Sequence, residues 1–390
     1  MKLKRFLNDY IFYILLIPFL FPRGFIEYFS LYKSFYTLWL YFSVISIYII
    51  GLFKLPKYIK GRNCLFILSI FLYFVVLASI TFLNRGTFSS SLQKIFATPA
   101  LCLLCITGFQ ENRKKFIFVT NNILTVMFIL NITLFNPLLW HNYFAPIGNH
   151  ITFLGHVQVV CQLGILHIIL AFLEHKCFKS HKIRFVFQIL LSLITMLASF
   201  TSASYLAIII LVLFFIIEKL KLYNFINFNS YVYIILYLAM NLIVFCFIGF
   251  GPSNLEIFGF SLNGRGYIWK EALKTIFKSP IIGYGSQGAL IKVFWSVWVG
   301  DGLGMNYMHN QILQIFLDGG IILFIPYLIL LGTSFYSINL IKDDKSRYWL
   351  NCFMLITLMV STFESTLEYF YMFYVFCIFA YLPFIFRKQR

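Results

Sequence analysis

Two short stretches of the chain carry residue types that can bind an anion and move a proton. The first is centred on Arg265, which stands between Gly264 and Gly266. A guanidinium can hold two phosphate oxygens at once, and flanking glycines let an anion approach the backbone N–H groups of a helix start. The second is the pair His309-Asn310. Because a histidine can take up or give up a proton, His309 is a candidate for that chemistry, as Arg265 is for binding an anion.

Both residues also have a structural interpretation, which the sequence leaves open. An arginine at a helix start can cap the helix or pair with an acid, and a histidine at a helix start is often a cap or an interface residue. Asp318 follows His309 on the same expected helix. At about 100° per residue it points away from His309, so we expect Asp318 to pair with a polar group of another helix.

The segment 265–278 (RGYIWKEALKTIFK) has to position Arg265, and its periodicity predicts an amphipathic helix. Apolar residues such as Trp269 fill one half of the helical wheel, while Lys270 and Lys274 lie on the other half. A helix of this kind lies at a membrane surface or over a helical bundle. Lys270 and Lys274 are further candidates for contacts with an anionic substrate.

The composition places these residues in a membrane protein. Of the 390 residues, 61% are hydrophobic and only 11% are charged, whereas a soluble domain is about half apolar and about a quarter charged. This excludes a soluble enzyme and a disordered chain. The sequence predicts an all-α, polytopic integral membrane protein that forms one domain over residues 1–390. A span needs about 20 apolar residues, and about twelve are expected, near 6–22, 34–53, 64–83, 91–109, 116–135, 151–173, 185–200, 202–217, 229–250, 310–334, 347–363 and 367–386.

The basic residues predict the orientation of these spans. The chain carries 31 Lys and Arg against 13 Asp and Glu, a formal net charge of +18. Most of the cations gather in alternate loops and at both ends, which is typical of cytoplasmic segments. We therefore expect both termini inside and one large extracytoplasmic loop over 251–309. Since topology explains the charge, we expect no nucleic-acid partner.

Cysteines and acidic pairs predict no cofactor. None of the eight cysteines falls in an expected outside loop, so no disulfide is expected. The pair Asp343-Asp344 superficially resembles a metal-binding motif. It lies in an expected cytoplasmic loop, far from Arg265 and His309, and is interpreted as solvated charge. We expect no metal site.

One ordered set of residues resembles a known family. Its members are Arg265, Trp269, Pro280, Gly283, Gly285, His309, Asn310, Leu313, Asp318 and Gly320. In this order, with a large outside loop before the histidine-bearing helix, they are similar to the signature of the O-antigen ligase/polymerase superfamily. That group includes Wzy-type polysaccharide polymerases and O-antigen ligases.

Two positions depart from the family pattern. Gly155-His156 resembles a G-x-H-P-N element, but Val157 and Gln158 replace its proline and asparagine. Where many members carry Ser-Arg, this chain has Ser204-Tyr205. The departure removes one expected phosphate-binding arginine.

The resemblance also implies further substrate contacts. Arg85, in another outside loop, is a candidate to supply the missing charge, and His156 and Asn310 are candidate substrate contacts. Trp295 and Trp298 can stack on sugar rings or act as interfacial anchors.

The resemblance implies a type C glycosyltransferase-like fold and a metal-independent reaction. The substrate would be an oligosaccharide on undecaprenyl diphosphate, at the outer face of the bacterial cytoplasmic membrane. Arg265 would bind the diphosphate. His309 would serve as general base or as a second phosphate contact, and the sequence does not separate these roles.

Three functions remain open at this stage. The first is a polymerase that joins lipid-linked repeat units of an O-antigen, capsule or exopolysaccharide, with an acceptor glycan as second substrate. A chain-length regulator and a flippase would be its partners in the bilayer. The second is a ligase that moves finished glycan to another acceptor. The third is a transporter of lipid-linked oligosaccharide, which is disfavoured because the charges that topology does not explain cluster outside.

Overall fold

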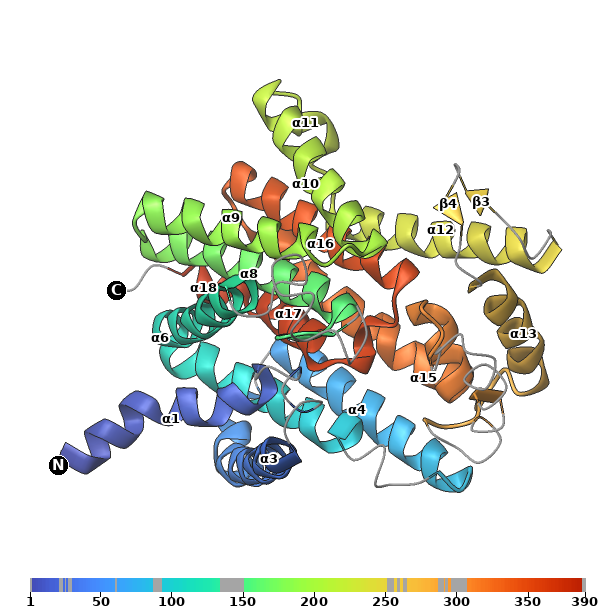
Figure 1. Cartoon of the computed structure of the whole chain (residues 1–390), viewed down its shortest axis with the longest axis horizontal. Helices are drawn as coiled ribbons and strands as arrows, with labels where there is room; N and C mark the ends of the chain where they lie inside the picture. Colours follow the sequence, from blue (N-terminus) through green and yellow to red (C-terminus); the bar gives the residue numbers. More distant parts are fainter. Residues whose placement is uncertain are drawn as a thin grey trace.

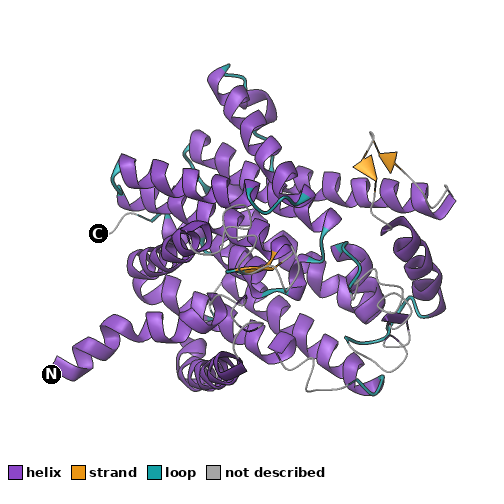
Figure 2. Cartoon of the chain, in the orientation of Figure 1, coloured by secondary structure: helices purple, strands orange, loops and turns teal. Residues whose placement is uncertain are grey.

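The computed structural model describes residues 2–20, 24, 26, 30–59, 62–86, 93–133, 151–250, 256–257, 260–261, 265–286, 291, 294–295 and 307–387. Within these residues the chain is helical, as expected (Figures 1 and 2). Strands are limited to two pairs of two residues each. These are β1 (Ile151–Thr152) with β2 (Gly155–His156), and β3 (Glu256–Ile257) with β4 (Phe260–Ser261).

The helices follow the expected apolar segments. The longer ones are α1 (Lys2–Leu20), α3 (Ser30–Tyr58), α4 (Arg62–Leu83), α6 (Thr98–Thr133), α8 (Val157–Phe178), α9 (Lys182–Leu197), α10 (Ser202–Lys219), α12 (Ser230–Phe250), α13 (Arg265–Lys278), α15 (Gln311–Tyr336), α16 (Asp344–Phe363) and α17 (Phe370–Ala380). The short ones are the π-helix η1 (Gln93–Ala97), α11 (Tyr223–Ile226), the 3-10 helices η3 (Ser337–Leu340) and η4 (Thr366–Glu368), and α18 (Leu382–Ile385).

Seven helices in the described part of the chain are long and apolar enough to cross a membrane. This supports a multi-pass membrane protein, whereas the number of about twelve spans stays a prediction. Two expected spans, 91–109 and 116–135, are covered by η1 and the single long helix α6, which has a non-helical residue at Asn112. α9 has 16 residues and α17 has 11, so both are short for a full span.

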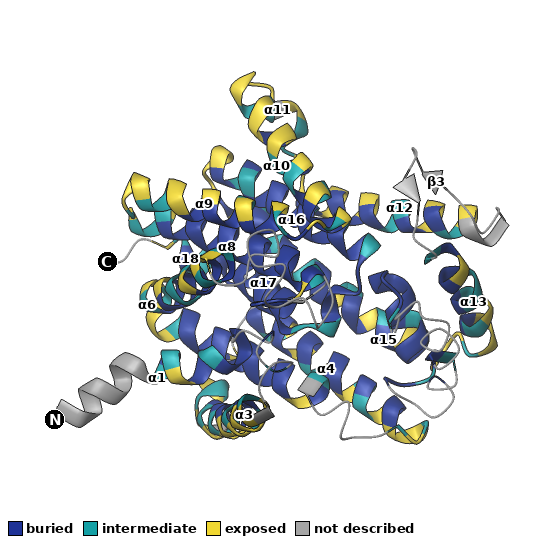
Figure 3. Ribbon diagram, viewed as in Figure 1, coloured by how far each residue is buried: buried dark blue, intermediate teal, exposed yellow. Residues whose placement is uncertain are grey.

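Burial divides the helices into an inner and an outer group. Every residue of α17 is buried, and so is nearly all of α8 (Figure 3). Helices that are apolar on all sides are buried either in a protein core or in lipid. By contrast, α10 and α12 expose rows of large apolar side chains such as Ile209, Phe215 and Leu242. Faces of this kind are suited to contact with lipid tails.

A break in α15 fixes that helix against the segment after α13. Gly320 has φ 56° and ψ −154°, and a Cβ atom there would lie 2.4 Å from the carbonyl carbon of Ile281. A residue with a side chain would not fit, so the glycine is required. Segment 280–285 satisfies the backbone groups that the break leaves without helical partners. The N–H groups of Tyr284 and Gly285 donate to Leu317 and Asp318, and those of Ile321 and Ile322 donate to Pro280 and Ile281.

Candidate active site

Arg265 and Glu364 form an ion pair between the start of α13 and the turn that follows α16. The guanidinium Nη2 lies 3.0 Å from Glu364 Oε1. Nη1 donates to the carbonyl oxygen of Phe363 at 2.8 Å, and the buried Nε has no hydrogen-bond partner among the described residues. The two acceptors explain why an arginine is tolerated on the buried side of α13. The interpretation of Arg265 as a salt-bridging residue is therefore confirmed, and its role toward a substrate remains open.

His309 contacts the same carboxylate from the other side. Its Nδ1 lies 3.0 Å from Glu364 Oε2, and both side chains are almost fully buried. His309 has φ 50°, a left-handed conformation that costs a residue other than glycine about 1 kcal/mol or more. Among the described residues, Nε2 of this ring has no hydrogen-bond partner. Glu364 thus brings the two predicted residues into one cluster.

The segment around His309 is held from both ends. Trp269 of α13 donates from its indole Nε1 to the carbonyl oxygen of Met308 at 2.6 Å. Asn310 is the N-cap of α15 and accepts from the N–H of Leu313 at 2.9 Å. These contacts place His309 between a helix face and a helix start, which stabilises its strained backbone.

Tyr307 and Gln158 complete the surroundings of the imidazole. The ring of Tyr307 lies 4.2 Å from that of His309, and its hydroxyl donates to Gln158 Oε1. The amide nitrogen of Gln158 lies 3.4 Å from His309 Nδ1. Burial, followed by the neighbouring Tyr369 and Glu364, raises the pKa of the Tyr307 phenol above its ordinary value. Tyr307 is therefore a hydrogen-bond donor in this site and not a base.

A second ion cluster lies next to the first. Lys94 of η1 pairs with Asp318 at 3.1 Å and with Glu368 at 2.6 Å. Gln314 links the clusters, because its amide nitrogen donates to Asp318 at 2.9 Å while its oxygen accepts from the N–H of Met308 at 2.9 Å. The expected pairing of Asp318 with a polar group of another helix is confirmed.

The prediction that His309 and Asp318 lie on one helix and point in opposite directions was wrong. His309 precedes the N-cap Asn310 and has a left-handed conformation, so it is not part of α15. A helical spacing of about 100° per residue does not apply across a cap. The separate roles of the two residues follow instead from their different partners.

The cationic candidates lie outside this cluster. Lys274 is exposed and pairs with Glu271 at 2.6 Å, and Lys270 is half-buried on the same helix. Arg85 is exposed in the turn after α4, with φ 54°. The neighbouring residue Thr81 accepts from the N–H of Ser286 at 3.0 Å, which joins this turn to the segment after α13. In the part of the chain that the structure describes, none of these three cations contacts Arg265 or His309, and their substrate contacts stay predictions.

The remaining candidates differ in their surroundings. His156 is exposed and is the N-cap of α8, where its side chain accepts from the N–H of Gln158, two residues on. Trp295 is buried in an apolar cluster with Trp269, which favours packing over sugar stacking. Trp298 lies outside the described residues. Asn310 is fully buried and donates to Asn241 and to the carbonyl oxygen of Thr362, so its amide has a structural role.

Sequence reasoning missed Glu364, the residue that joins the cluster. It also missed Lys94 and Glu368. One signal was available: of only 13 acidic residues in the chain, Glu364 falls in the short turn between the last two expected spans and Glu368 lies just inside the last of them. Acidic residues at such a place are rarely needed for topology, because the orientation rule depends on Lys and Arg.

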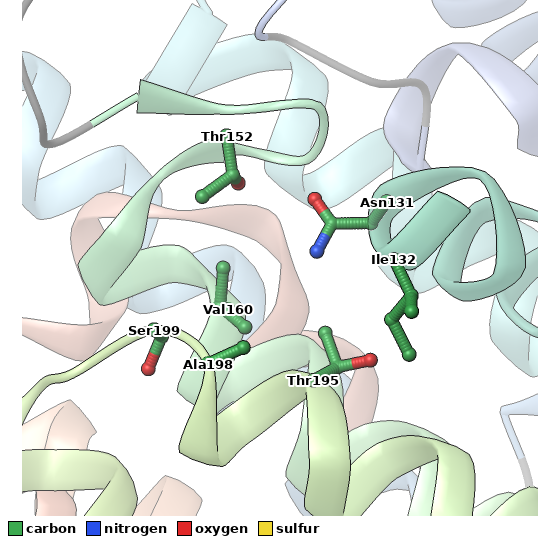
Figure 4. A pocket seen from close by; sticks show the side chains of 7 residues that line it. All are labelled: Asn131, Ile132, Thr152, Val160, Thr195, Ala198 and Ser199. Carbon is green, nitrogen blue, oxygen red and sulfur yellow. The ribbon is translucent and has the colours of Figure 1, made fainter. Parts of the chain in front are cut away.

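Two cavities are lined by residues other than those of the cluster. A cavity with room for about one water molecule, roughly 10 Å³, is lined by Asn131, Ile132, Thr152, Val160, Thr195, Ala198 and Ser199 (Figure 4). A groove of about 590 Å³ runs between α8, α9, α10 and α16 and is lined mostly by apolar side chains. It reaches Lys345 and Trp349 near the start of α16, whereas Glu364 follows the end of that helix.

Metal binding is not suggested by the described residues. No group of three or more His, Cys, Asp or Glu side chains among them could hold a metal ion. The charged side chains of the first cluster are Arg265 and Glu364. In the neighbouring cluster, Lys94 pairs with Asp318 and Glu368. Arginine and lysine can stabilise a phosphate without a metal.

The fold and the cluster define a polytopic helical membrane protein with a buried Arg–Glu–His arrangement at helix ends. Residues 187–328 match the family model described as O-antigen ligase. This match confirms the resemblance to the O-antigen ligase/polymerase superfamily, and it includes Arg265 and His309 but not Glu364, Lys94 or Gln158. A comparison with curated proteins found no match.

Proposed function

We propose that this protein is a metal-independent glycosyltransferase that joins oligosaccharide repeat units carried on undecaprenyl diphosphate. The reaction takes place at the outer face of the bacterial cytoplasmic membrane. The observation that supports the proposal most strongly is the cluster in which Arg265 and His309 contact one carboxylate. It brings an anion-binding group next to a group that can accept a proton, and both lie in the region of the family match.

The chemistry of the cluster suits transfer from a lipid diphosphate. The leaving diphosphate gains negative charge as its bond to the sugar breaks, and a preorganised guanidinium stabilises that charge. Among the described residues, Nη1 of Arg265 contacts only the carbonyl oxygen of Phe363, so this nitrogen retains a hydrogen for a phosphate oxygen. His309 serves as the base for the acceptor hydroxyl or as a second phosphate contact.

A ligase is the second candidate, because the matching family model, described as O-antigen ligase, does not distinguish the two reactions. A ligase would transfer finished glycan to another acceptor with the same cluster. A polymerase and a ligase therefore differ in the acceptor and not in the chemistry at Arg265. In the polymerase reading, a chain-length regulator and a flippase act beside the protein in the bilayer.

Analysis of the glycans in a deletion strain of the native host tests the proposal. Single repeat units on lipid indicate a polymerase, and long chains that remain on lipid indicate a ligase. An unchanged glycan profile contradicts both. A reporter fused after Ser286 tests the location: it should be active only as an exported-side reporter, because cytoplasmic activity would put Arg265 and His309 on the wrong face.

A further inference from the structure

We propose that Glu364 is a positioning residue that makes His309 the base of the transfer, with Nε2 as the atom that accepts the proton. This inference rests on the proposed function, because it assigns a role within that reaction. It removes the ambiguity between a base and a second phosphate contact. It also gives a function to a residue that lies outside the segment matched by the family model.

The two oxygens of the Glu364 carboxylate contact different partners, and these contacts determine which nitrogen of His309 holds the hydrogen. Oε1 lies 3.0 Å from Arg265 Nη2, and Oε2 lies 3.0 Å from His309 Nδ1. A guanidinium can only donate, and a carboxylate paired with it accepts. His309 Nδ1 therefore carries a hydrogen and donates it to Oε2. The other contact of Nδ1, with the amide nitrogen of Gln158 at 3.4 Å, is longer and does not compete with this bond.

The assignment of Nδ1 determines the state of Nε2. When one ring nitrogen of a neutral imidazole holds the hydrogen, the other is an acceptor. Nε2 of His309 has no partner among the described residues. A second phosphate contact would need a hydrogen on Nε2 as well as on Nδ1, which only the protonated ring carries. The neutral ring that Glu364 selects thus offers a lone pair and not a donor.

The step can be written in full from these contacts. The oxygen of the acceptor hydroxyl forms a bond to the anomeric carbon of the donor sugar, and its proton moves to His309 Nε2. The bond between the anomeric carbon and the diphosphate oxygen breaks, and the electron pair leaves with the diphosphate. Glu364 stabilises the positive imidazolium that forms, as an acidic partner does for a catalytic histidine elsewhere. Arg265, positioned by the same carboxylate, stabilises the leaving group.

Glu364→Gln is the variant that separates positioning from simple structure. Because Arg265 only donates, the amide oxygen has to face Arg265, and the amide NH₂ then faces His309 Nδ1. Nδ1 must accept, so the hydrogen moves to Nε2 and the base is lost while size and hydrogen bonds remain. We expect kcat to fall about 10³–10⁴-fold, as for other histidines that lose their acidic partner. KM for the donor should change by less than about fivefold, because Arg265 keeps an acceptor.

The measurement uses the purified full-length chain in liposomes, with lipid-linked glycan extracted from the deletion strain as the substrate. Glu174→Gln is the matched control, because Glu174 is also a buried acid paired with an arginine, Arg184, but lies in another part of the molecule. The control should retain its activity per molecule. Glu364→Asp keeps the charge and should recover part of the activity lost in Glu364→Gln.

The outcomes distinguish this inference from the proposed function. A Glu364→Gln variant with near-normal kcat, or with a raised KM alone, overturns the positioning role. If His309→Ala is also active, the proposed function fails with it; if His309→Ala is inactive, only the role of Glu364 fails. Should Glu364→Gln not accumulate in the membrane, Glu364→Asp decides: a reduced kcat at unchanged KM supports positioning, and a normal kcat overturns it.

Discussion

Two buried clusters of this molecule contain an arginine, a glutamate and a nearby histidine, and they differ in what they leave unpaired. In the first, Glu364 contacts Arg265 and His309. In the second, Glu174 of α8 pairs with Arg184 of α9 at 2.8 Å and accepts from Asn121 of α6 at 2.6 Å. The residue types are the same, so residue type alone does not identify a reactive site.

The histidines show the difference most clearly. His167, on α8 near the second cluster, uses both ring nitrogens: Nδ1 contacts Ser192 at 2.7 Å and Nε2 contacts Thr125 at 3.0 Å. His309 uses Nδ1 and leaves Nε2 without a partner among the described residues. A ring that is hydrogen-bonded on both sides specifies helix packing, whereas a ring with one free acceptor can react.

The two clusters also differ in where the chain places them. Glu174, Arg184 and His167 all lie within regular helices that pack together. Arg265 starts a helix, His309 precedes one in a left-handed conformation, and Glu364 follows one. Helix ends carry free backbone groups and can admit a ligand, while the middle of a packed helix cannot. The comparison therefore supports the proposal that the reaction takes place at the first cluster, while the second stabilises the fold.

The largest expected effect separates the two histidines. His309→Ala should reduce polymer formation by about 10²–10⁴-fold through loss of the base, with normal abundance in the membrane. His167→Ala should keep its activity per molecule but lose about 1–3 kcal/mol of stability, because the hydroxyls of Ser192 and Thr125 lose a buried partner. Glycan size profiles normalised to protein amount, with thermal unfolding in detergent, measure both. Equal loss of activity per molecule in the two variants would contradict the comparison.

The two arginines give the next largest effect. Arg265→Lys keeps the charge but loses the planar fork, and we expect about a 10²-fold loss of activity, comparable to removal of one preorganised donor. Arg184→Lys loses the two contacts that Arg184 makes to Glu174, yet it should affect only protein abundance. Donor turnover per molecule in liposomes distinguishes the cases. An active Arg265→Lys protein would argue against phosphate binding at this position.

The sequence predicted Arg265 and His309 as candidates but did not predict the carboxylate that connects them. The bounds of α13 agree with the predicted 265–278, because its amphipathic pattern is strong enough to mark both ends. Glu364 was missed because the contact joins three elements that are distant in the chain, and no local pattern encodes it. The position of α17 in the core was also not predictable, since a helix buried in protein and one exposed to lipid have the same apolar composition.

Substitutions of Asp318 are expected to have effects on activity and abundance that lie between those in the two clusters. Asp318→Asn keeps an acceptor for Gln314 or Lys94, and Glu368 still pairs with Lys94, so substantial activity should remain. Asp318→Leu leaves the Gln314 amide without its partner and weakens the hold on a buried lysine, so the amount of folded protein should fall. Membrane abundance and activity per molecule are measured together. An Asp318→Asn protein that is fully expressed yet as inactive as His309→Ala would move Asp318 into the reactive cluster.

The smallest expected effect concerns the exposed cations of α13. Within the described part of the chain, Lys274 pairs with Glu271 on the same helix surface, and exposed pairs of this kind contribute little, about 0.2–1 kcal/mol. Lys274→Ala and Lys270→Ala should therefore reduce activity by less than about fivefold, which corresponds to at most about 1 kcal/mol. Raising the salt concentration should weaken even this effect, because solvent-exposed charges are screened. If these variants lose as much activity as Arg265→Lys, substrate binding depends on a broad positive surface, and the contrast between one reactive cluster and the rest of the molecule no longer holds.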